Sequence, residues 1–167
     1  MRATERNVME LDVPGSPEAV FDYLVDLNRL PEWDKPVRQA VLLDESMQQG
    51  ARWQIRLHGL RTRRPIVLTV VDLDRPRRCE YVVRGHRVTA HDVLELRPTM
   101  SGCTHLTITA DVELRGVFAP GARLVRLAGP LMRAATVHYI TRAVWRAVKS
   151  RPAGSGAPDR SPRRGAA

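Results

Sequence analysis

The chain has 167 residues, and its 27 lysines and arginines against 18 acidic residues give a formal net charge of +9. The length fits one domain, and a hydrophobic fraction of 43% is typical of a globular protein with a packed core. No apolar run approaches the ~20 residues of a membrane-spanning helix, and no signal peptide is recognisable, so we expect a cytoplasmic protein.

The basic excess is almost entirely arginine, and it gathers in two predicted turns, at residues 61–64 and 75–78. A nucleic-acid-binding protein collects such charge on one face, with aromatic side chains on which bases stack. Here 5% of the residues are aromatic and no nucleic-acid-binding motif is present, so we expect no nucleic-acid partner. The arginines either form an ordinary solvated surface or meet an acidic partner, such as an acyl carrier protein or an anionic membrane surface.

Residues 8–13 alternate apolar and polar side chains, which predicts a strand, and a helix follows it. Ser16 is a favourable N-cap, Pro17 suits the first helical position, and Glu18 places negative charge in the first turn. Pro31 is predicted to end this helix. Apolar side chains recur within it at helical spacing: Val20, Phe21, Leu24 and Leu27.

The middle of the chain predicts a series of antiparallel strands separated by turn residues. Their ranges are 37–43, 50–57, 66–73, 79–84, 87–96 and 104–115. The last strand alternates most regularly, with Leu106 and Ile108 on one face and Thr107 and Thr109 on the other. Such strands form a sheet with one face on the core and one face in water.

The segment 121–150 is predicted to be a helix that covers the apolar face of the sheet, with an interruption at Pro130. Residues 1–150 thus form the predicted domain. Residues 151–167, rich in Pro, Gly, Ala, Ser and Arg, are predicted to be a disordered tail. The predicted inward stripe of the helix is Leu124, Leu127, Leu131, Ala134, His138, Thr141 and Trp145.

The chain resembles the START-like (SRPBCC) superfamily in three features. These are the order of its predicted elements, the segment SPEAVFDYLVDLNRLPEW at residues 16–33, and the strand segment SGCTHLTITADVELRG at residues 101–116. Within that superfamily the chain most resembles the polyketide cyclase/dehydrase and lipid-transport proteins. The resemblance implies an α+β helix-grip fold, in which a curved antiparallel sheet wraps around a long C-terminal helix. It also implies an internal cavity that holds a hydrophobic small molecule.

His138 is the first candidate catalytic residue, because it stands in the middle of the predicted inward stripe. A histidine there could move a proton or polarise a carbonyl, since histidine changes its protonation near neutral pH. The alternative is a structural histidine held by a backbone or threonine partner.

Asp92 is the candidate partner of His138, because it alternates in step with Ala90 and Leu94 and so falls on the core face of its strand. A β-bulge would instead turn Asp92 outward and His91 inward.

Tyr81 and Tyr139 are candidates to donate hydrogen bonds to a ligand oxygen, although tyrosine is also common in half-buried structure. The resemblance places Trp33 and Trp53 where members of the superfamily often carry aromatic residues at the cavity or its entrance. Either tryptophan could instead be part of the core. Arg142 lies at the edge of the predicted stripe, where it either meets an acidic ligand group or extends into solvent.

The two cysteines and five histidines show no metal-ligand spacing, and no P-loop, dinucleotide or nucleophile-elbow motif is present. We therefore expect neither a metal nor a cofactor. The leading hypothesis is binding of a polyketide-like molecule, with cyclisation by aldol chemistry and then dehydration. In that hypothesis His138 is the acid and base, Asp92 orients it and Tyr81 polarises a carbonyl. The alternatives are a non-catalytic lipid or quinone carrier, and an accessory subunit that acts through protein contacts.

Overall fold

The computed structural model describes residues 2–58, 65–86, 88–115 and 136–147. The described strands are β1 (Arg2–Pro14), β2 (Val37–Leu42), β3 (Arg52–Leu57), β4 (Ile66–Asp74), β5 (Arg78–Arg84), β6 (Val88–Pro98) and β7 (Cys103–Arg115). The described helical elements are α1 (Pro17–Val25), the 3-10 turn η1 (Leu27–Arg29), α2 (Leu30–Trp33) and residues 136–147, called the closing helix below. Four parts of the sequence prediction lie outside the described residues: the arginines of 61–64, the interruption at Pro130, the tail at 151–167, and the stripe residues Leu124, Leu127, Leu131 and Ala134.

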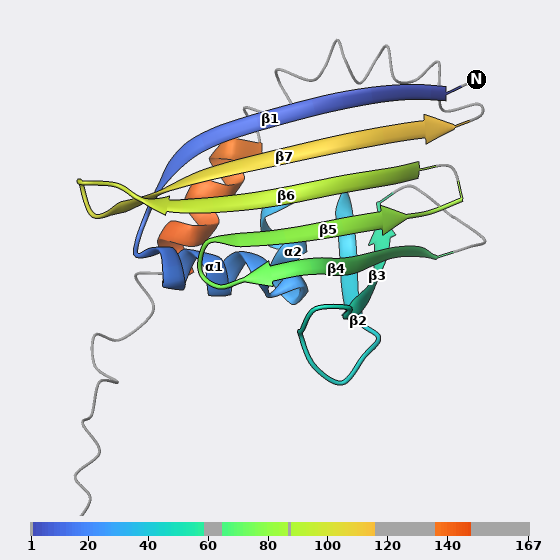
Figure 1. Ribbon diagram of the computed structural model, residues 1–167, viewed down its shortest axis with the longest axis horizontal. Helices are drawn as coiled ribbons and strands as arrows, with labels where there is room; N and C mark the ends of the chain where they lie inside the picture. The colour runs from blue at the N-terminus through green and yellow to red at the C-terminus, as the bar shows by residue number, and fades with distance from the viewer. Residues whose placement is uncertain (1, 59–64, 87, 116–135, 148–167) are drawn as a thin grey trace, which may run out of the picture.

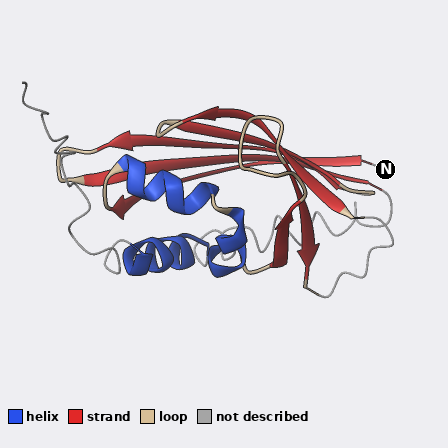
Figure 2. Cartoon of the chain, turned by 90° about the horizontal axis from the view of Figure 1, so that it is seen from below, coloured by secondary structure: helices blue, strands red, loops and turns tan. Residues whose placement is uncertain are grey.

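In the described part of the chain, seven strands form one antiparallel sheet in the order β1-β7-β6-β5-β4-β3-β2. β1 and β7 pair along their whole lengths, from Arg2 opposite Arg115 to Pro14 opposite Cys103. Five neighbouring strands of the sheet, β1, β7, β6, β5 and β4, run side by side, whereas β3 and β2 turn steeply away from them (Figure 1). Figure 2 shows the helices on one side of the sheet, with β2 and β3 curling towards that side. This is the curled α+β helix-grip architecture that the sequence predicts.

The corner between β1 and α1 directs the first helix under the sheet. Gly15 has a φ of 113°, a conformation that a residue with a side chain rarely adopts. Its carbonyl accepts a 2.8 Å hydrogen bond from the hydroxyl of Thr104, a fully buried residue of β7. Ser16 then caps the helix as predicted, because its side chain accepts a hydrogen bond from the amide of Ala19. The helix buries Val20, Phe21, Tyr23 and Leu24 against the core.

The segment that was predicted to be one helix up to Pro31 is divided, so that prediction is wrong. Asp26, with a ψ of 84°, ends α1, and the 3-10 turn follows it. α2 begins at Leu30 with Pro31 in its first turn. The first turn of a helix does not need the amide hydrogen that proline lacks. Pro31 therefore helps to start a helix here instead of ending one.

The closing helix packs on the sheet with a different face from the predicted one. Ile140 and Val144 are fully buried and Ala143 nearly so, whereas His138 and Trp145 are exposed. The predicted inward stripe through His138 is therefore wrong. Both stripes have helical spacing, but the buried one is purely aliphatic, so it loses no polar hydration when it packs. None of the helices in the described residues is long and apolar enough to span a membrane.

Substitutions on the two stripes of the closing helix should have unequal effects on stability. Ile140→Ala removes fully buried methyl groups and should lower the free energy of unfolding by about 2–5 kcal/mol. His138→Ala, at an exposed position, should change it by less than about 0.5 kcal/mol. Urea denaturation followed by circular dichroism measures both. Equal losses in the two variants would contradict the observed orientation of the helix.

Candidate functional site

The face of the sheet that lies towards the helices, the inner face, is mostly apolar. Its buried side chains form one core with α1, α2 and the closing helix. They include Leu11, Val13, Trp53, Ile55, Ile66, Leu68, Val70, Cys79, Tyr81, Ala90, Leu94, Leu96 and Leu106. A charged or polar group on this face is therefore surrounded mainly by hydrocarbon, where an unpaired group costs free energy.

Asp92 lies on the inner face. β6 pairs with both of its neighbours without a register shift at this point, which places Tyr81 and Ala110 directly opposite Asp92. The residues two positions away on the same strand, Ala90 and Leu94, are buried at 8% and 3% exposure. Asp92 thus has the position that alternation predicts, and the ladder contains no bulge that would turn it outward.

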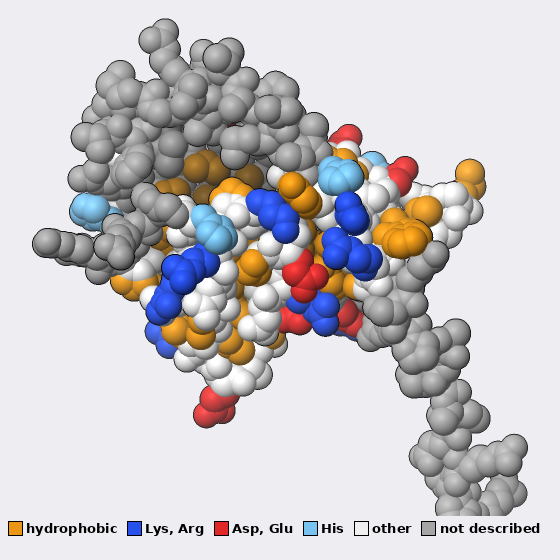
Figure 3. Space-filling model, turned by 180° about the vertical axis from the view of Figure 1, so that it is seen from behind, with side chains coloured by type: hydrophobic (Ala, Val, Ile, Leu, Met, Phe, Trp, Pro, Cys, Tyr) orange, Lys and Arg blue, Asp and Glu red, His pale blue; other side chains and the backbone are white. Residues whose placement is uncertain are grey.

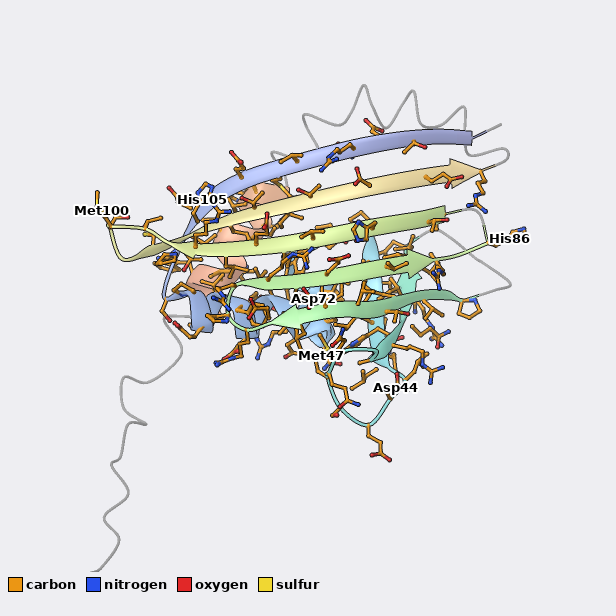
Figure 4. All side chains as sticks on the ribbon, in the orientation of Figure 1. Asp44, Met47, Asp72, His86, Met100 and His105 are labelled. Carbon is orange, nitrogen blue, oxygen red and sulfur yellow. The ribbon has the colours of Figure 1, made fainter. Side chains whose placement is uncertain are left out.

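The preceding residue, His91, points to the outer face, where it meets charged side chains. Its Nε2 lies 2.5 Å from a carboxylate oxygen of Glu80, and Glu80 also pairs with Arg78. Arg78 in turn lies 2.5 Å from Asp72 on β4, which Figure 4 labels. The hydrogen bonds from His91 and Arg78 hold the pKa of Glu80 below its usual value. This outer network is on the opposite face of the sheet from Asp92, so it does not neutralise that carboxyl by direct contact.

A second half-buried carboxyl, Asp34, is electrostatically coupled to Asp92. Asp34 directly follows α2 and precedes β2. Burial raises the pKa of Asp34 to about 6. Burial also raises the pKa of Asp92 to about 6, and the nearby charge of Asp34 adds to the shift. Among the described residues, no side chain donates a hydrogen bond to either carboxyl. Asp34, at the end of α2, and Asp92, on the inner face, are called the acidic pair below, because the charge of Asp34 contributes to the raised pKa of Asp92.

Sequence reasoning did not select Asp34. An aspartate between the end of a helix and the start of a strand is an ordinary turn residue, and nothing in the local pattern separates it from one. One feature of the sequence could have selected Asp34. It directly follows Trp33, the last residue of the segment 16–33 that carries the family resemblance.

Three hydrogen-bond donors near this pair are buried and have no partner in the described part of the chain. They are Nε1 of Trp33, Nε1 of Trp53 and the hydroxyl of Tyr81. Burial raises the pKa of Tyr81 well above its usual value, and the neighbouring thiol of Cys79 and then the charge of Asp92 add to the shift. Sulfur is a weak hydrogen-bonding partner, so Cys79 does not satisfy this hydroxyl. Each unpaired buried donor typically costs about 1–3 kcal/mol, which makes the group a candidate for contact with a ligand.

The other predicted site residues lie outside this group. His138, Tyr139 and Arg142 are all exposed on the closing helix. The prediction that His138 faces the interior is therefore wrong, and the exposure of Arg142 agrees with the alternative that it extends into solvent. The ring of Tyr139 contacts His138 edge-on at 5.7 Å between centroids, and Nζ of Lys35 lies 4.8 Å from its centroid. Figure 3, which views the molecule from the side of the helices, shows cationic, acidic and hydrophobic side chains together on this surface.

The described residues contain no group of three His, Cys, Asp or Glu side chains that could hold a metal ion. The histidines are spread over the sheet: His86 and His105 lie at different ends of it (Figure 4). His105 is used in an ion pair, with its Nδ1 2.7 Å from a carboxylate oxygen of Asp12. The described residues can offer proton transfer by the carboxyl groups of Asp34 and Asp92, and hydrogen-bond donation by Tyr81, Trp33 and Trp53.

A curled sheet with helices on its inner side and polar groups on an apolar wall defines a protein of the START-like class. The sequence model of the family described as polyketide cyclase / dehydrase and lipid transport matches residues 6–151, and the chain belongs to this family. The resemblance seen in the sequence is thus confirmed. No curated protein matches the chain in sequence.

Solved structures share the fold. A conserved protein from Geobacillus kaustophilus is 21% identical, with a TM-score of 0.67, covering 85% of this chain and 96% of that one. The Zhui aromatase/cyclase from Streptomyces sp. R1128 is 14% identical with a TM-score of 0.71, covering 89% and 98%. Ara h 8.0201 is 12% identical with a TM-score of 0.56, covering 83% and 98%. At these identities the similarity establishes the fold alone.

The acidic pair should make stability depend on pH. Because the pKa values of folded Asp34 and Asp92 are raised to about 6, the folded state holds extra protons between about pH 4 and pH 6. Stability should therefore fall as the pH rises through this window. Asp34→Asn and Asp92→Asn remove the ionised charge, so each should stabilise the protein at pH 8 by about 1–2 kcal/mol and change little at pH 4.

Thermal unfolding at the two pH values measures this difference. Glu10→Gln is the control, because Glu10 is an exposed acid on the outer side of β1. Variants of Asp34 and Asp92 that destabilise the protein at pH 8 would contradict the assignment of an uncompensated acidic pair.

Proposed function

We propose that the chain binds a hydrophobic, polyketide-like small molecule in an internal cavity between the sheet and the helices. Membership of the family supports this proposal. The observation that carries it is the set of buried donors at Trp33, Trp53 and Tyr81 that have no partner among the described residues, with Tyr81 directly opposite Asp92 on an otherwise apolar wall. A ligand with carbonyl or hydroxyl oxygens would satisfy donors that the protein leaves unpaired. The three donor atoms are sealed from solvent, so the ligand reaches them only after side chains move.

The same groups suit cyclisation by aldol chemistry followed by dehydration. The ionised Asp92 would take a proton from a carbon between two carbonyls, and the Tyr81 hydroxyl would donate a hydrogen bond to the oxygen that gains negative charge. The resulting carbanion would attack a second carbonyl of the same chain and close the ring. The protonated Asp92 would then return its proton to the alkoxide formed by this attack, which gives a hydroxyl and restores the carboxylate. In the dehydration the carboxylate would take a further α-proton and pass it to that hydroxyl, which leaves as water. A carboxyl whose pKa is raised to about 6 suits both roles near neutral pH.

The second candidate function is a non-catalytic carrier of a lipid or quinone. The family description includes lipid transport, and the inner face is apolar enough to hold such a ligand without reaction. For either function, the exposed surface of the closing helix is our candidate for contact with an acyl carrier protein or an anionic membrane surface. Arg142, Tyr139 and Lys35 are exposed there, and cationic side chains near aromatic ones favour an acidic partner.

Filling the inner face should weaken the binding of an apolar probe. N-phenyl-1-naphthylamine, a neutral dye that fluoresces in apolar surroundings, is expected to bind the parent protein. Ala110→Phe places a large side chain opposite Asp92 and should weaken binding by about tenfold or more. Thr109→Phe is the matched control, because the adjacent residue points to the outer face, and it should bind like the parent. Equal binding by both variants, with folded circular dichroism spectra, would contradict an internal site.

Turnover separates the two candidate functions. A cyclase should convert a poly-β-ketone thioester to an aromatic product, which is followed by its absorbance. Tyr81→Phe and Asp92→Asn should lower the rate by about 10²–10⁴-fold, the range for loss of an acid–base group, while probe binding is retained. His138→Gln, on the exposed side of the closing helix, should leave the rate unchanged. A parent protein that binds the dye but forms no product would favour the carrier.

A further inference from the structure

The net charge of the chain is concentrated after β7. Residues 1–115 contain 17 lysines and arginines and 17 acidic residues, so their formal charge is zero. Residues 116–167 contain ten lysines and arginines and a single acid, Asp159, which accounts for the whole net charge of +9. Such a charge difference between two parts of a chain indicates interaction with an anionic surface or macromolecule. The part of this segment that the structure describes is the closing helix, residues 136–147.

The closing helix has two sides with different chemistry. Ile140, Ala143 and Val144 are buried against the core. The other side is exposed, and residues 136–147 contain no acid. Lys35, whose Nζ lies 4.8 Å from the ring centroid of Tyr139, extends this exposed side beyond the helix. The whole surface, called the basic aromatic face below, consists of Lys35, His138, Tyr139, Arg142, Trp145 and Arg146.

Two aromatic side chains are exposed on the basic aromatic face. Trp145 is 47% exposed and Tyr139 is 37% exposed, whereas the other two tryptophans, Trp33 and Trp53, are buried. A large ring left in water forgoes the free energy that burial of its apolar surface would provide. Tryptophan and tyrosine are enriched where a bilayer meets water, because the ring and its polar N–H or O–H both find suitable surroundings there.

The cations beside these rings suit anionic lipid headgroups. Each lysine or arginine close to an anionic bilayer adds a favourable electrostatic contribution to binding. Acidic side chains also lie on this side of the molecule (Figure 3). In the neighbouring helical elements, however, Asp26 and Glu32 already pair with Arg29, at 3.1 and 3.8 Å. The basic aromatic face thus combines positive charge with rings that gain from leaving water.

We propose that the basic aromatic face docks the protein on an anionic membrane surface, with the rings of Tyr139 and Trp145 among the lipid headgroups. This decides between the two partners considered above for the closing helix. The role of docking rests on the proposed function, because a bilayer is a place where a hydrophobic ligand can be taken up or released. An acidic protein would also attract the cations, but it would need a matching pocket for each ring, whereas a bilayer interface accepts both rings anywhere.

Co-sedimentation of the full chain with lipid vesicles tests the charge requirement. The parent should bind vesicles of equal parts phosphatidylcholine and phosphatidylserine about tenfold or more tighter than vesicles of phosphatidylcholine alone, and added salt should weaken this binding. Arg142→Gln/Arg146→Gln removes two positive charges and should lower the affinity for the anionic vesicles by about tenfold or more. Arg142→Gln alone, with about a fivefold loss, serves if the double variant lacks the circular dichroism spectrum of the parent.

Arg84→Gln/Arg97→Gln is the matched control for the double variant. It removes the same charge from exposed positions of β5 and β6, away from the closing helix. Its affinity for the anionic vesicles should stay within about threefold of that of the parent, because only cations close to the bilayer contribute strongly.

Tryptophan fluorescence tests whether the docking uses this face. Among the three tryptophans of the chain, Trp145 alone is exposed, so its emission should shift to shorter wavelength when anionic vesicles take its ring out of water. Trp145→Phe should lose the shift and still sediment with the vesicles. A parent that binds vesicles with unchanged emission overturns the proposal, because the ring of Trp145 then stays in water.

The remaining outcomes separate docking from the proposed function. Equal binding to both kinds of vesicle, or equal loss in the two double variants, overturns the docking proposal. Binding of an acyl carrier protein or a DNA duplex through Arg142 and Arg146, by a parent that does not bind vesicles, also overturns it. Binding of N-phenyl-1-naphthylamine in solution without vesicle binding overturns docking and leaves the internal site standing. Vesicle binding without dye binding leaves docking standing and overturns the proposed function.

Discussion

The pairing of the first strand with the last described strand is the constraint on which the rest of the structure depends. β1 and β7 are joined along thirteen residue pairs, so the beginning of the chain is fixed against residues about a hundred positions later. At the end of this ladder, Thr104 of β7 holds the carbonyl of Gly15, and the chain turns there into α1. That corner sets which side of the sheet the helices cover, and hence which alternate residues of every strand become the inner face.

The two faces of the sheet then carry different electrostatics, because successive side chains of a strand point to opposite sides. On β6, His91 joins Glu80 and the outer ion pairs, while the next residue, Asp92, enters the apolar interior. The outer charges are paired and partly solvated, so each contributes little to stability. The inner carboxyls of Asp34 and Asp92 have no side-chain partner among the described residues, so burial makes their ionised forms costly. A fold that keeps such charges is less stable than it could be, which is common where a binding site requires them.

Asp34 and Asp92 come from different layers of the fold, the helices and the sheet. Asp92 is held by a continuous hydrogen-bonded ladder on both sides of β6, so its position is rigid. Asp34 follows the short helix α2, whose Trp33 packs in the core. The exposed side of the closing helix, with Tyr139 and Arg142, remains for contacts with other molecules.

Local patterns in the sequence determined the N-cap at Ser16, the alternating strands and the family to which the chain belongs, whereas the unshifted register of β6 in the structure decided that Asp92 and not His91 points inward. The first three follow from neighbouring residues, because capping and alternation depend on spacing along the chain. The tertiary structure alone decided that Ile140 and Val144, and not His138, face the sheet, since two stripes on one helix had the same period. It also decided that Asp34 lies near enough to Asp92 for its charge to raise the pKa of that residue. No spacing along the chain encodes that approach, because the packing of α2 against the curled sheet creates it.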